Sequence, residues 1–314
     1  MWKYILKRLL AMVVIVVVAA FLIFTILYFT PADPADALLG FGATPEEKAA
    51  FRAQLGIDQP YLVQLSNYMY NTFIKFDFGI SWTKNIPVFE ALMQCIPYTV
   101  IISLSSMLIN VTIGLILGVL AGVHAGKWQD SAVMALAMVF IACPNFWVAL
   151  LMVILFSGTL HWLPSYGVDG FTSYIMPVIS SCIAGIAINA RFSRNSIVEV
   201  FREDYITTAR AKGLREKAVI YKHMLPNALM PTITNIGRIL ANIIAGNAVI
   251  ETIFSVPGVG RYMLTAIRGR DYPAVRASVL FFAVFVSIVM LVVDIVYALV
   301  DPRIKAEFSS GKRG

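Results

Sequence analysis

Charged residues are scarce in this chain, and so are the residues that build most chemical sites. Only 14% of the 314 residues are Asp, Glu, Lys or Arg, against roughly a quarter in a typical soluble domain. The three cysteines, Cys95, Cys143 and Cys182, are too few and too scattered for a disulfide framework, and no CxxC pair occurs. With three histidines in the whole chain, the ligand spacings of a structural zinc site are missing as well.

Motifs of the common enzyme classes are missing too. The sequence contains no GxxxxGK[ST] phosphate loop, no HExxH and no GxSxG nucleophile elbow. An intramembrane protease would need a second aspartate to pair with Asp294 in another apolar run, and there is none. We therefore expect that the chain is not an enzyme, binds no cofactor or metal and does not hydrolyse ATP itself.

Long apolar runs are what the chain has instead. It is 59% hydrophobic with a mean hydropathy of +0.78, and about 20 apolar residues suffice for a helix to cross a bilayer. The sequence therefore predicts an all-α membrane protein with about six transmembrane helices. The runs are residues 9–29, 100–122, 132–156, 174–190, 228–250 and 277–300. Pro144 predicts a kink in the third run, and the fourth is the shortest.

The distribution of Lys and Arg predicts the orientation. With the N-terminus in the cytoplasm, sixteen of these residues fall in cytoplasmic segments and eight in outer segments, as the positive-inside rule requires. The net charge of +7 is thus explained by topology, and no nucleic acid partner is expected. Both termini are predicted to be cytoplasmic.

These spans divide the chain into four segments. Residues 1–29 form a cytoplasmic tip and the first span, and residues 30–97 form a long extracytoplasmic loop. Residues 98–300 form the core transmembrane bundle, with a cytoplasmic loop at 193–227 between the fourth and fifth spans. Residues 301–314 form a cytoplasmic tail.

The long outer loop contains its own helix signals. Thr44 is a predicted N-cap, with Pro45 at the first helical position and Glu47 three residues after the cap. Gly56 ends the pattern, so a helix is expected from Pro45 to about Leu55. The aromatic and weakly charged stretch 61–77 suits a helix lying at the membrane interface.

The cytoplasmic loop is the most informative segment. Acidic residues come early in 199–212 and basic residues late, which favours a helix. Gly213 breaks it, and a second short helix is expected from Leu214 to about Met224, ending because Pro226 restricts Leu225. Two exposed helices joined at a glycine would form an elbow for a partner protein to push. The alternative interpretation is an ordinary basic, helical cytoplasmic loop.

The spacing within this loop resembles the signature of ABC importer permeases: Glu-Ala-Ala, three residues, Gly, nine residues, Ile-x-Leu-Pro. The matching positions are Thr207-Thr208-Ala209, then Gly213, then His223-Met224-Leu225-Pro226. Thr207, Thr208 and His223 depart from the Glu, Ala and Ile of that signature.

The form Thr208–Leu214 resembles the dipeptide, oligopeptide and nickel permease family. Further matches to that family follow in order along nearly the whole chain. They are Asp33-Pro34, Leu55-Gly56-Ile57-Asp58-Gln59-Pro60, Asp77-Phe78-Gly79, Trp162-Leu163-Pro164, Glu251-Thr252-Ile253-Phe254, Pro257-Gly258-Val259-Gly260, Arg270-Asp271-Tyr272-Pro273 and Asp301-Pro302-Arg303.

The resemblance implies a half-pore in a bacterial cytoplasmic membrane. Its partners would be a homologous second permease subunit, two cytoplasmic ATP-binding subunits that hold ATP and Mg, and an extracytoplasmic solute-binding protein. The cytoplasmic loop would dock into a cleft of the ATPase. The residues that the resemblance assigns to this loop are Glu203, Asp204, Thr207, Thr208, Ala209, Arg210, Ala211, Lys212, Gly213, Leu214, Leu225 and Pro226.

Short peptides are the favoured cargo, with chelated nickel or another small solute as alternatives. Few histidines argue mildly against handling of bare metal ions. Rival interpretations are an ion-coupled secondary transporter, for which Asp294 would be the buried carboxylate, and a membrane-anchored scaffold.

Two further groups of residues are candidates for the transport path and its gate. Polar residues inside spans mark a path by default, or else form hydrogen bonds between helices; these are Asn110, Asn189, Asn242 and Asn247. The last outer loop, 257–276, is either an interfacial anchor or, by resemblance, the lip of an external gate. Its gate residues would be Pro257, Gly258, Gly260 and Arg261.

Overall fold

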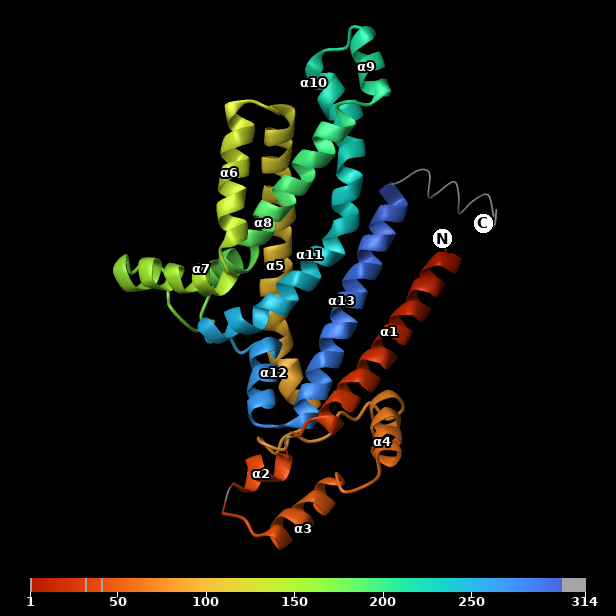
Figure 1. Ribbon diagram of the computed structural model, residues 1–314, viewed down its shortest axis with the longest axis vertical. Coiled ribbons are helices and arrows are strands. Elements are labelled where there is room, and N and C mark those ends of the chain that lie inside the picture. Colours follow the sequence, from red (N-terminus) through yellow and green to blue (C-terminus); the bar gives the residue numbers. More distant parts are fainter. Residues whose placement is uncertain (1, 32, 41, 301–314) are drawn as a thin grey trace. The chain divides into compact units, whose positions relative to one another are not determined.

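The computed structural model of the chain describes residues 2–31, 33–40 and 42–300 (Figure 1). The predicted cytoplasmic tail, 301–314, lies outside these residues. Helices make up nearly all of the regular structure of the described part, which otherwise contains one isolated bridge between Ile80 and Pro87. The all-α expectation is confirmed.

The chain divides into two compact units. Unit 1 comprises Val100–Val256 together with Met1–Ile5 and Val289–Gly314, and unit 2 comprises Leu6–Thr99 with Pro257–Ile288. The outer loop and the segment before the last span thus belong to one unit, although almost 160 residues of sequence separate Thr99 from Pro257.

Within the described residues, four helical segments are long and apolar enough to cross a membrane: Leu6–Phe29, Val88–Val123, Thr172–Val200 and Tyr272–Ile295. Two bent pairs of helices raise the number to six if each pair is one span, which agrees with the six predicted runs. One pair joins Asn235–Ile244 to Gly246–Ile253 at 42°.

The third predicted run, 132–156, is not one helix with a kink. It is α6 (Trp128–Ala142) and α7 (Asn145–Met152) with the π-helix η1 (Val153–Thr159), bent by 95°. The break occurs because Cys143 adopts an extended conformation (φ −88°, ψ 120°), as the residue before a proline prefers. Pro144 then starts α7 as its N-cap.

Unit 2 contains α1 (Trp2–Phe29) from Leu6 on, α2 (Pro34–Leu39), α3 (Pro45–Leu55) and α4 (Tyr61–Phe73). It also holds the first turns of α5 (Val88–Val123), α12 (Val259–Arg268) and the first half of α13 (Tyr272–Val300). The prediction for α3 is confirmed at both ends. Thr44 and Glu47 form a reciprocal capping box, and Gly56 closes the helix in the left-handed region at φ +66°.

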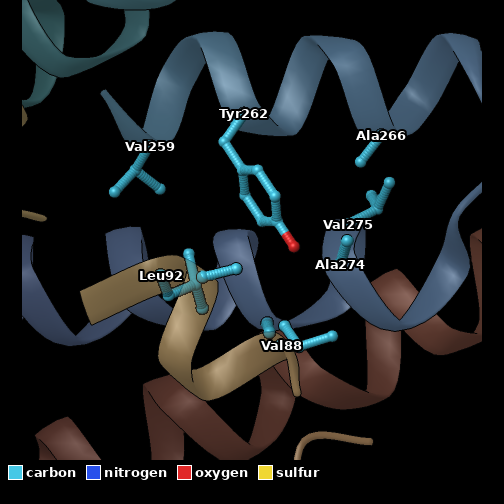
Figure 2. Packing of buried hydrophobic residues seen from close by; sticks show 9 residues of the cluster. Val88, Leu92, Val259, Tyr262, Ala266, Ala274 and Val275 are labelled. Atoms are coloured by element: carbon cyan, nitrogen blue, oxygen red, sulfur yellow. The ribbon is translucent and has the colours of Figure 1, made fainter. Parts of the chain in front are cut away.

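The core of unit 2 forms where α12 packs against the start of α5 and of α13 (Figure 2). Tyr262 lies between Val88 and Leu92 of α5, and small residues such as Ala266 and Ala274 allow the helices to approach closely. Val259 N donates a 2.8 Å hydrogen bond to Thr99 Oγ1, which fixes the start of α12 against α5.

Unit 1 is organised around α8 (Thr172–Val200), which contacts α6, α7 and α11 (Leu225–Ile253). A glycine stripe on α5 brings that helix against α8 as well. A Cβ at Gly114, Gly118 or Gly122 would lie 2.8, 2.5 or 2.5 Å from the nearest side-chain atom of α8. Only glycine therefore permits this separation of the two helices.

Candidate functional site

The loop between α8 and α11 folds as an elbow beyond the ends of these two helices (Figure 1). The elbow consists of α9 (Asp204–Ala211), the turn at Gly213, α10 (Glu216–Ala218) and the π-helix η2 (Val219–Met224). The predicted break at Gly213 is confirmed, since this residue has φ +75°, which glycine adopts without strain.

The first predicted helix, 199–212, is interrupted, which corrects the sequence-based boundary. Helix α8 ends at Val200, and Glu203 is extended (φ −69°, ψ 142°) before α9 begins at Asp204. This reversal of direction buries Ile206 and Ala209 against Ile197 at the end of α8. A continuous helix would leave those apolar side chains in solvent, so burial decides the break.

The second predicted helix does not stop before Pro226, which corrects a second expectation. Leu225 is helical (φ −58°, ψ −46°), and η2 runs directly into α11. The Leu225 N–H donates to Ile220 O, a wider π-type bond. Pro226 then lies in the first turn of α11, where a missing N–H costs little.

Arg210 holds the two arms of the elbow together. Its Nη2 and Nε donate hydrogen bonds of 2.8 and 3.2 Å to the two carboxylate oxygens of Glu216. The guanidinium also lies 4.2 Å from the ring centroid of Phe201, a cation–π distance. The Arg210 hydrogen bond lowers the pKa of Glu216 below its ordinary value, so the pair is charged at neutral pH.

The elbow has a buried and an exposed face. Ile206, Ala209, Val219 and Met224 pack with the end of α8 and the start of α11 in one apolar cluster. Of the signature residues, Thr207, Thr208, Ala211, Lys212 and Leu214 are exposed. Ala209, which the resemblance assigned to the docking loop, instead faces inward.

The sequence analysis did not identify three large apolar side chains that are exposed on the elbow. Tyr205 and Tyr221 are 41% and 69% exposed, and Leu214 is 41% exposed. Large exposed apolar groups in a charged loop are typical of contact surfaces. The sequence could not predict that these side chains are exposed, because only the fold shows which face of each short helix is covered.

A cavity of about 450 Å³ adjoins the elbow, lined by Arg194, Glu199, Arg202 and Asp204 among others. Arg194 Nη2 forms a 2.7 Å ion pair with Asp130 Oδ2, and this oxygen also accepts a 2.9 Å hydrogen bond from Gly126 N. The turn before α6 is thereby tied to α8 close to the elbow. The sequence analysis missed this contact, whose only signal is a lone acid at the start of an apolar run.

Two of the predicted path asparagines, Asn189 and Asn247, link helices of unit 1 through their side chains, and a third, Asn110, accepts through its backbone carbonyl. Asn189 Nδ2 of α8 donates a 3.2 Å hydrogen bond to the carbonyl of Asn110 in α5. Asn247 of α11 donates to Ser103 Oγ at 2.8 Å and accepts from Ser181 Oγ at 3.2 Å. The fourth asparagine, Asn242, is exposed.

The predicted gate residues surround the start of α12 in unit 2. Pro257 is exposed and Arg261 is half-buried, while Gly258, the N-cap position, and Gly260 are buried. Much of the last outer loop is thus helical rather than irregular.

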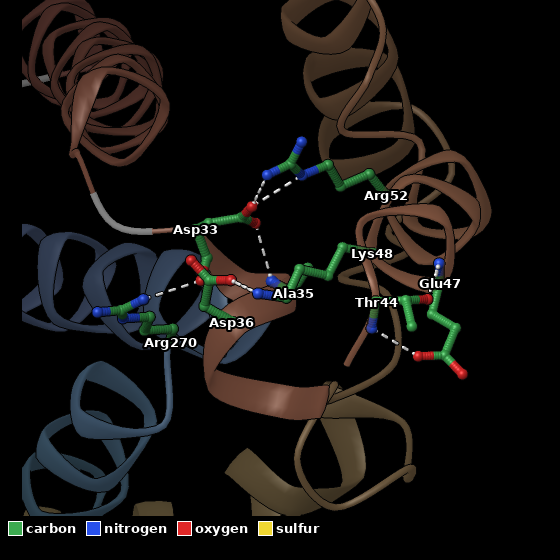
Figure 3. Close-up of polar contacts among 8 residues, drawn as sticks. All are labelled: Asp33, Ala35, Asp36, Thr44, Glu47, Lys48, Arg52 and Arg270. Atoms are coloured by element: carbon green, nitrogen blue, oxygen red, sulfur yellow. Dashed lines mark hydrogen bonds and ion pairs between the residues drawn. The ribbon is translucent and has the colours of Figure 1, made fainter. Parts of the chain in front are cut away.

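Asp33 and Asp271, each part of a motif noted in the sequence, take part in hydrogen bonds between the segment that follows α12 and the loop 30–97. The carboxylate of Asp33 accepts from Ala35 N and from Arg52, and its carbonyl accepts a 2.9 Å hydrogen bond from Arg270 Nη1 (Figure 3). Asp271 accepts from Ser81 and Thr83, both in the loop before α5.

The profile of the family described as "binding-protein-dependent transport system inner membrane component" matches residues 114–306, and that of its N-terminal component matches residues 1–104. The chain belongs to this family of ABC importer permeases. The match covers both the elbow and the outer loop, as the sequence resemblance predicted.

Curated relatives cover the permease almost completely. A putative peptide transport system permease protein of Brucella abortus (strain 2308) is 38% identical over 313 residues, 97% of this chain and 99% of the relative. The glutathione transport system permease of Salmonella choleraesuis (strain SC-B67) is 37% identical over 305 residues, with the same coverage.

A solved structure supports the fold of the permease. The crystal structure of an amino acid ABC transporter with histidines aligns with a TM-score of 0.50 over 68% of this chain and 94% of that chain. At 14% identity this likeness concerns the fold only. The permease is thus a multi-pass membrane transport subunit, not an enzyme, of a class that works with further permease, ATPase and binding-protein subunits.

Proposed function

We propose that this permease imports short peptides and that its elbow receives the movement of partner ATPases. The observation that carries this proposal is the continuity of η2 with the first half of α11, because a displacement of η2 passes directly into that helix as far as the 42° bend after Ile244. The other arm, α9, is held to that helix by Arg210 and Glu216 and by the buried cluster beneath.

The exposed face of the elbow supports docking to a protein. Thr207, Thr208 and Ala211 are small enough to let a partner surface approach, and Lys212 supplies a charge that sets its register. Pushing on this face would move α8 and α11 together, since these two helices are in extensive contact. Rocking of these helices is the proposed basis of alternating access.

The proposed assembly contains a homologous second permease subunit and two cytoplasmic ATP-binding subunits that bind ATP and Mg. An extracytoplasmic solute-binding protein delivers the cargo to the end of the permease that carries α12, where Pro257, Gly258, Gly260 and Arg261 form the lip of a gate. Both termini and the elbow face the cytoplasm in this orientation, which the excess of basic residues in those segments supports.

Short peptides are the cargo class that the relatives support best. One relative is named for peptide transport and the other for glutathione, itself a tripeptide. Chelated nickel is the alternative. Uptake of a radiolabelled tripeptide in vesicles carrying the whole transporter, in competition with nickel chelates, distinguishes the two; competition by chelates but not by other peptides would contradict peptide transport.

A charge placed on the exposed face of the elbow tests the coupling role. Thr208→Arg should lower ATP-driven uptake at least about tenfold while the complex still assembles, because a bulky cation prevents close docking. The matched control is Thr30→Arg, because both threonines are exposed and both donate to the carbonyl four residues earlier. Undiminished uptake by Thr208→Arg would refute the docking role, and uptake driven by an ion gradient without ATPase would identify a secondary transporter.

A further inference from the structure

Unit 2 contains a cavity of about 690 Å³ that none of the roles above uses. It lies between the end of α1, the turn joining α3 to α4, the loop 77–85 and the first turn of α13. Its volume falls within the range of about 300–1,000 Å³ that is usual for small-molecule sites. In the orientation proposed above, it belongs to the extracytoplasmic side.

Arg276 supplies the cation of this cavity. Its guanidinium stacks 4.6 Å from the ring centroid of Phe24 and 5.1 Å from that of Tyr68, and the residue is half-buried. Within the described part of the chain no carboxylate pairs with Arg276, and its buried Nε has no hydrogen-bond acceptor. A partly buried guanidinium without an acceptor is costly unless a ligand supplies one.

The remaining polar lining is rich in groups that bond to peptides. Asn67, Asn71 and Thr72 of α4 face the cavity, and Trp82 adds an aromatic wall. Gln64 also lines the cavity, but its amide nitrogen is engaged with the carbonyls of Ile57 and Gln59.

The cavity also has one carboxylate, at a more exposed position than the cation. Asp77 is exposed and accepts a 2.8 Å hydrogen bond from Gly79 N on one oxygen. Arg276 is thus the less exposed cation and Asp77 the more exposed anion of one cavity. This arrangement complements a zwitterionic ligand whose carboxylate enters first and whose ammonium group stays near the opening.

We propose that this cavity binds short peptides, with the terminal carboxylate on Arg276. Arg276 lies within cation–π distance of both Phe24 and Tyr68, and its guanidinium carries a planar fork of donors that fits a bidentate contact with a carboxylate. The permease would thereby hold cargo itself, in addition to any delivered by a binding protein. This inference rests on the proposed import of peptides.

Equilibrium binding tests the inference without ATP or transport. The complete transporter, without the solute-binding protein, is placed in nanodiscs of neutral phosphatidylcholine and titrated calorimetrically with trialanine and with trialanine amide. We expect trialanine to bind and the amide, which lacks the carboxylate, to bind at least about tenfold more weakly. Arg276→Gln should weaken trialanine binding to the level of the amide.

Two variants separate loss of the site from loss of the fold. Arg276→Lys keeps the charge but not the planar fork, so it should restore part of the affinity. Arg268→Gln removes the same charge from an exposed position on α12 outside the cavity and should bind as wild type.

Equal affinity for trialanine and its amide would overturn the proposal, as would undiminished binding by Arg276→Gln. Binding of anionic phosphatidylglycerol that depends on Arg276, with no peptide binding in neutral nanodiscs, would overturn it in favour of a lipid phosphate. ATP-driven uptake is measured separately, in vesicles. Peptide import in vesicles without peptide binding in nanodiscs would therefore refute this site and leave the proposed function intact.

Discussion

Arg210 Nη2 donates a 2.8 Å hydrogen bond to Glu216 Oε1 across the turn at Gly213. With the second bond, from Arg210 Nε to Glu216 Oε2, it joins the two arms of the elbow on their solvent side, while Ile206 and Val219 join them on the buried side. A turn closed on both sides behaves as one rigid piece. In the proposed function, an elbow closed in this way would transmit force instead of bending at the glycine.

Loss of the ion pair should loosen the elbow without unfolding it. We expect Glu216→Gln to raise amide hydrogen exchange in α9 about two- to fivefold, because exposed ion pairs contribute only about 0.2–1 kcal/mol. Lys217→Gln is the control, being adjacent and exposed with no ion pair in the described structure. Equal exchange in the two variants would show that the pair does not hold the elbow.

Gly213→Ala should strain the same turn from within the backbone. The residue has φ +75° and open space around it, so an added methyl group meets no atom and the cost is conformational, about 1 kcal/mol. Gly126→Ala carries the same strain at φ +77°, also in open space. We expect only Gly213→Ala to lower the ratio of peptide taken up to ATP hydrolysed. Equal ratios in both variants would contradict a mechanical role for the turn.

Gly118→Ala should force α5 away from α8. The new Cβ would lie 2.5 Å from Ser193 Cβ and 2.7 Å from the Ala190 carbonyl oxygen. We expect a loss of about 1–3 kcal/mol, as for overpacked cores, seen as a lower thermal midpoint of the purified complex. Gly158→Ala, whose nearest neighbour would be 3.8 Å away, should leave the midpoint unchanged.

Asp33 should make the outer loop sensitive to acid. Although partial burial opposes its ionisation, the hydrogen bonds from Arg52 and Ala35 hold the pKa of Asp33 below its ordinary value. A carboxyl with a lowered folded-state pKa stabilises the fold above the unfolded-state pKa and loses that contribution as pH falls toward the folded-state value.

The thermal midpoint of the wild type should therefore drop more between about pH 5 and pH 3 than that of Asp33→Asn. Asp58→Asn, an exposed carboxylate in the same loop, serves as the control and should follow the wild type. A wild-type curve parallel to that of Asp33→Asn would mean that the Asp33 contacts contribute no stability.

The Asp130–Arg194 pair should show direct coupling in a double-mutant cycle. Asp130→Ala, Arg194→Ala and the double variant are compared by reversible unfolding in mild detergent. We expect an interaction energy of about 1.5–3 kcal/mol, the range for hydrogen bonds to charged groups. Strict additivity would show that the two side chains do not support each other.

Local rules predicted the elements whose signals are contained in a few neighbouring residues. The α3 helix follows from the Thr44–Glu47 capping box and from Gly56, and the turn at Gly213 follows from the same kind of reasoning. The run at 132–156 was predicted with a kink alone, because the sequence shows the proline but not the 95° change of direction.

The candidate site was only partly predictable for the same reason. The signature spacing identified which residues form the elbow, but not that Ala209 faces inward or that η2 continues into α11. The Arg276 cavity had no sequence signal, because Phe24, Tyr68 and Arg276 are far apart in the chain.

Composition and run length by themselves determined that this protein is a helical membrane protein, and Gly213 where its elbow turns, since hydrophobic run length and glycine conformation are local properties of the chain; the permease function was indicated only by resemblance to a known family. Tertiary structure alone decided which face of the elbow is exposed, that Asn189 and Asn247 link helices, and that Arg276, whose Nε has no acceptor among the described residues, faces a cavity. Those outcomes depend on which distant segments pack together, and burial against a particular neighbour is not encoded at any single position.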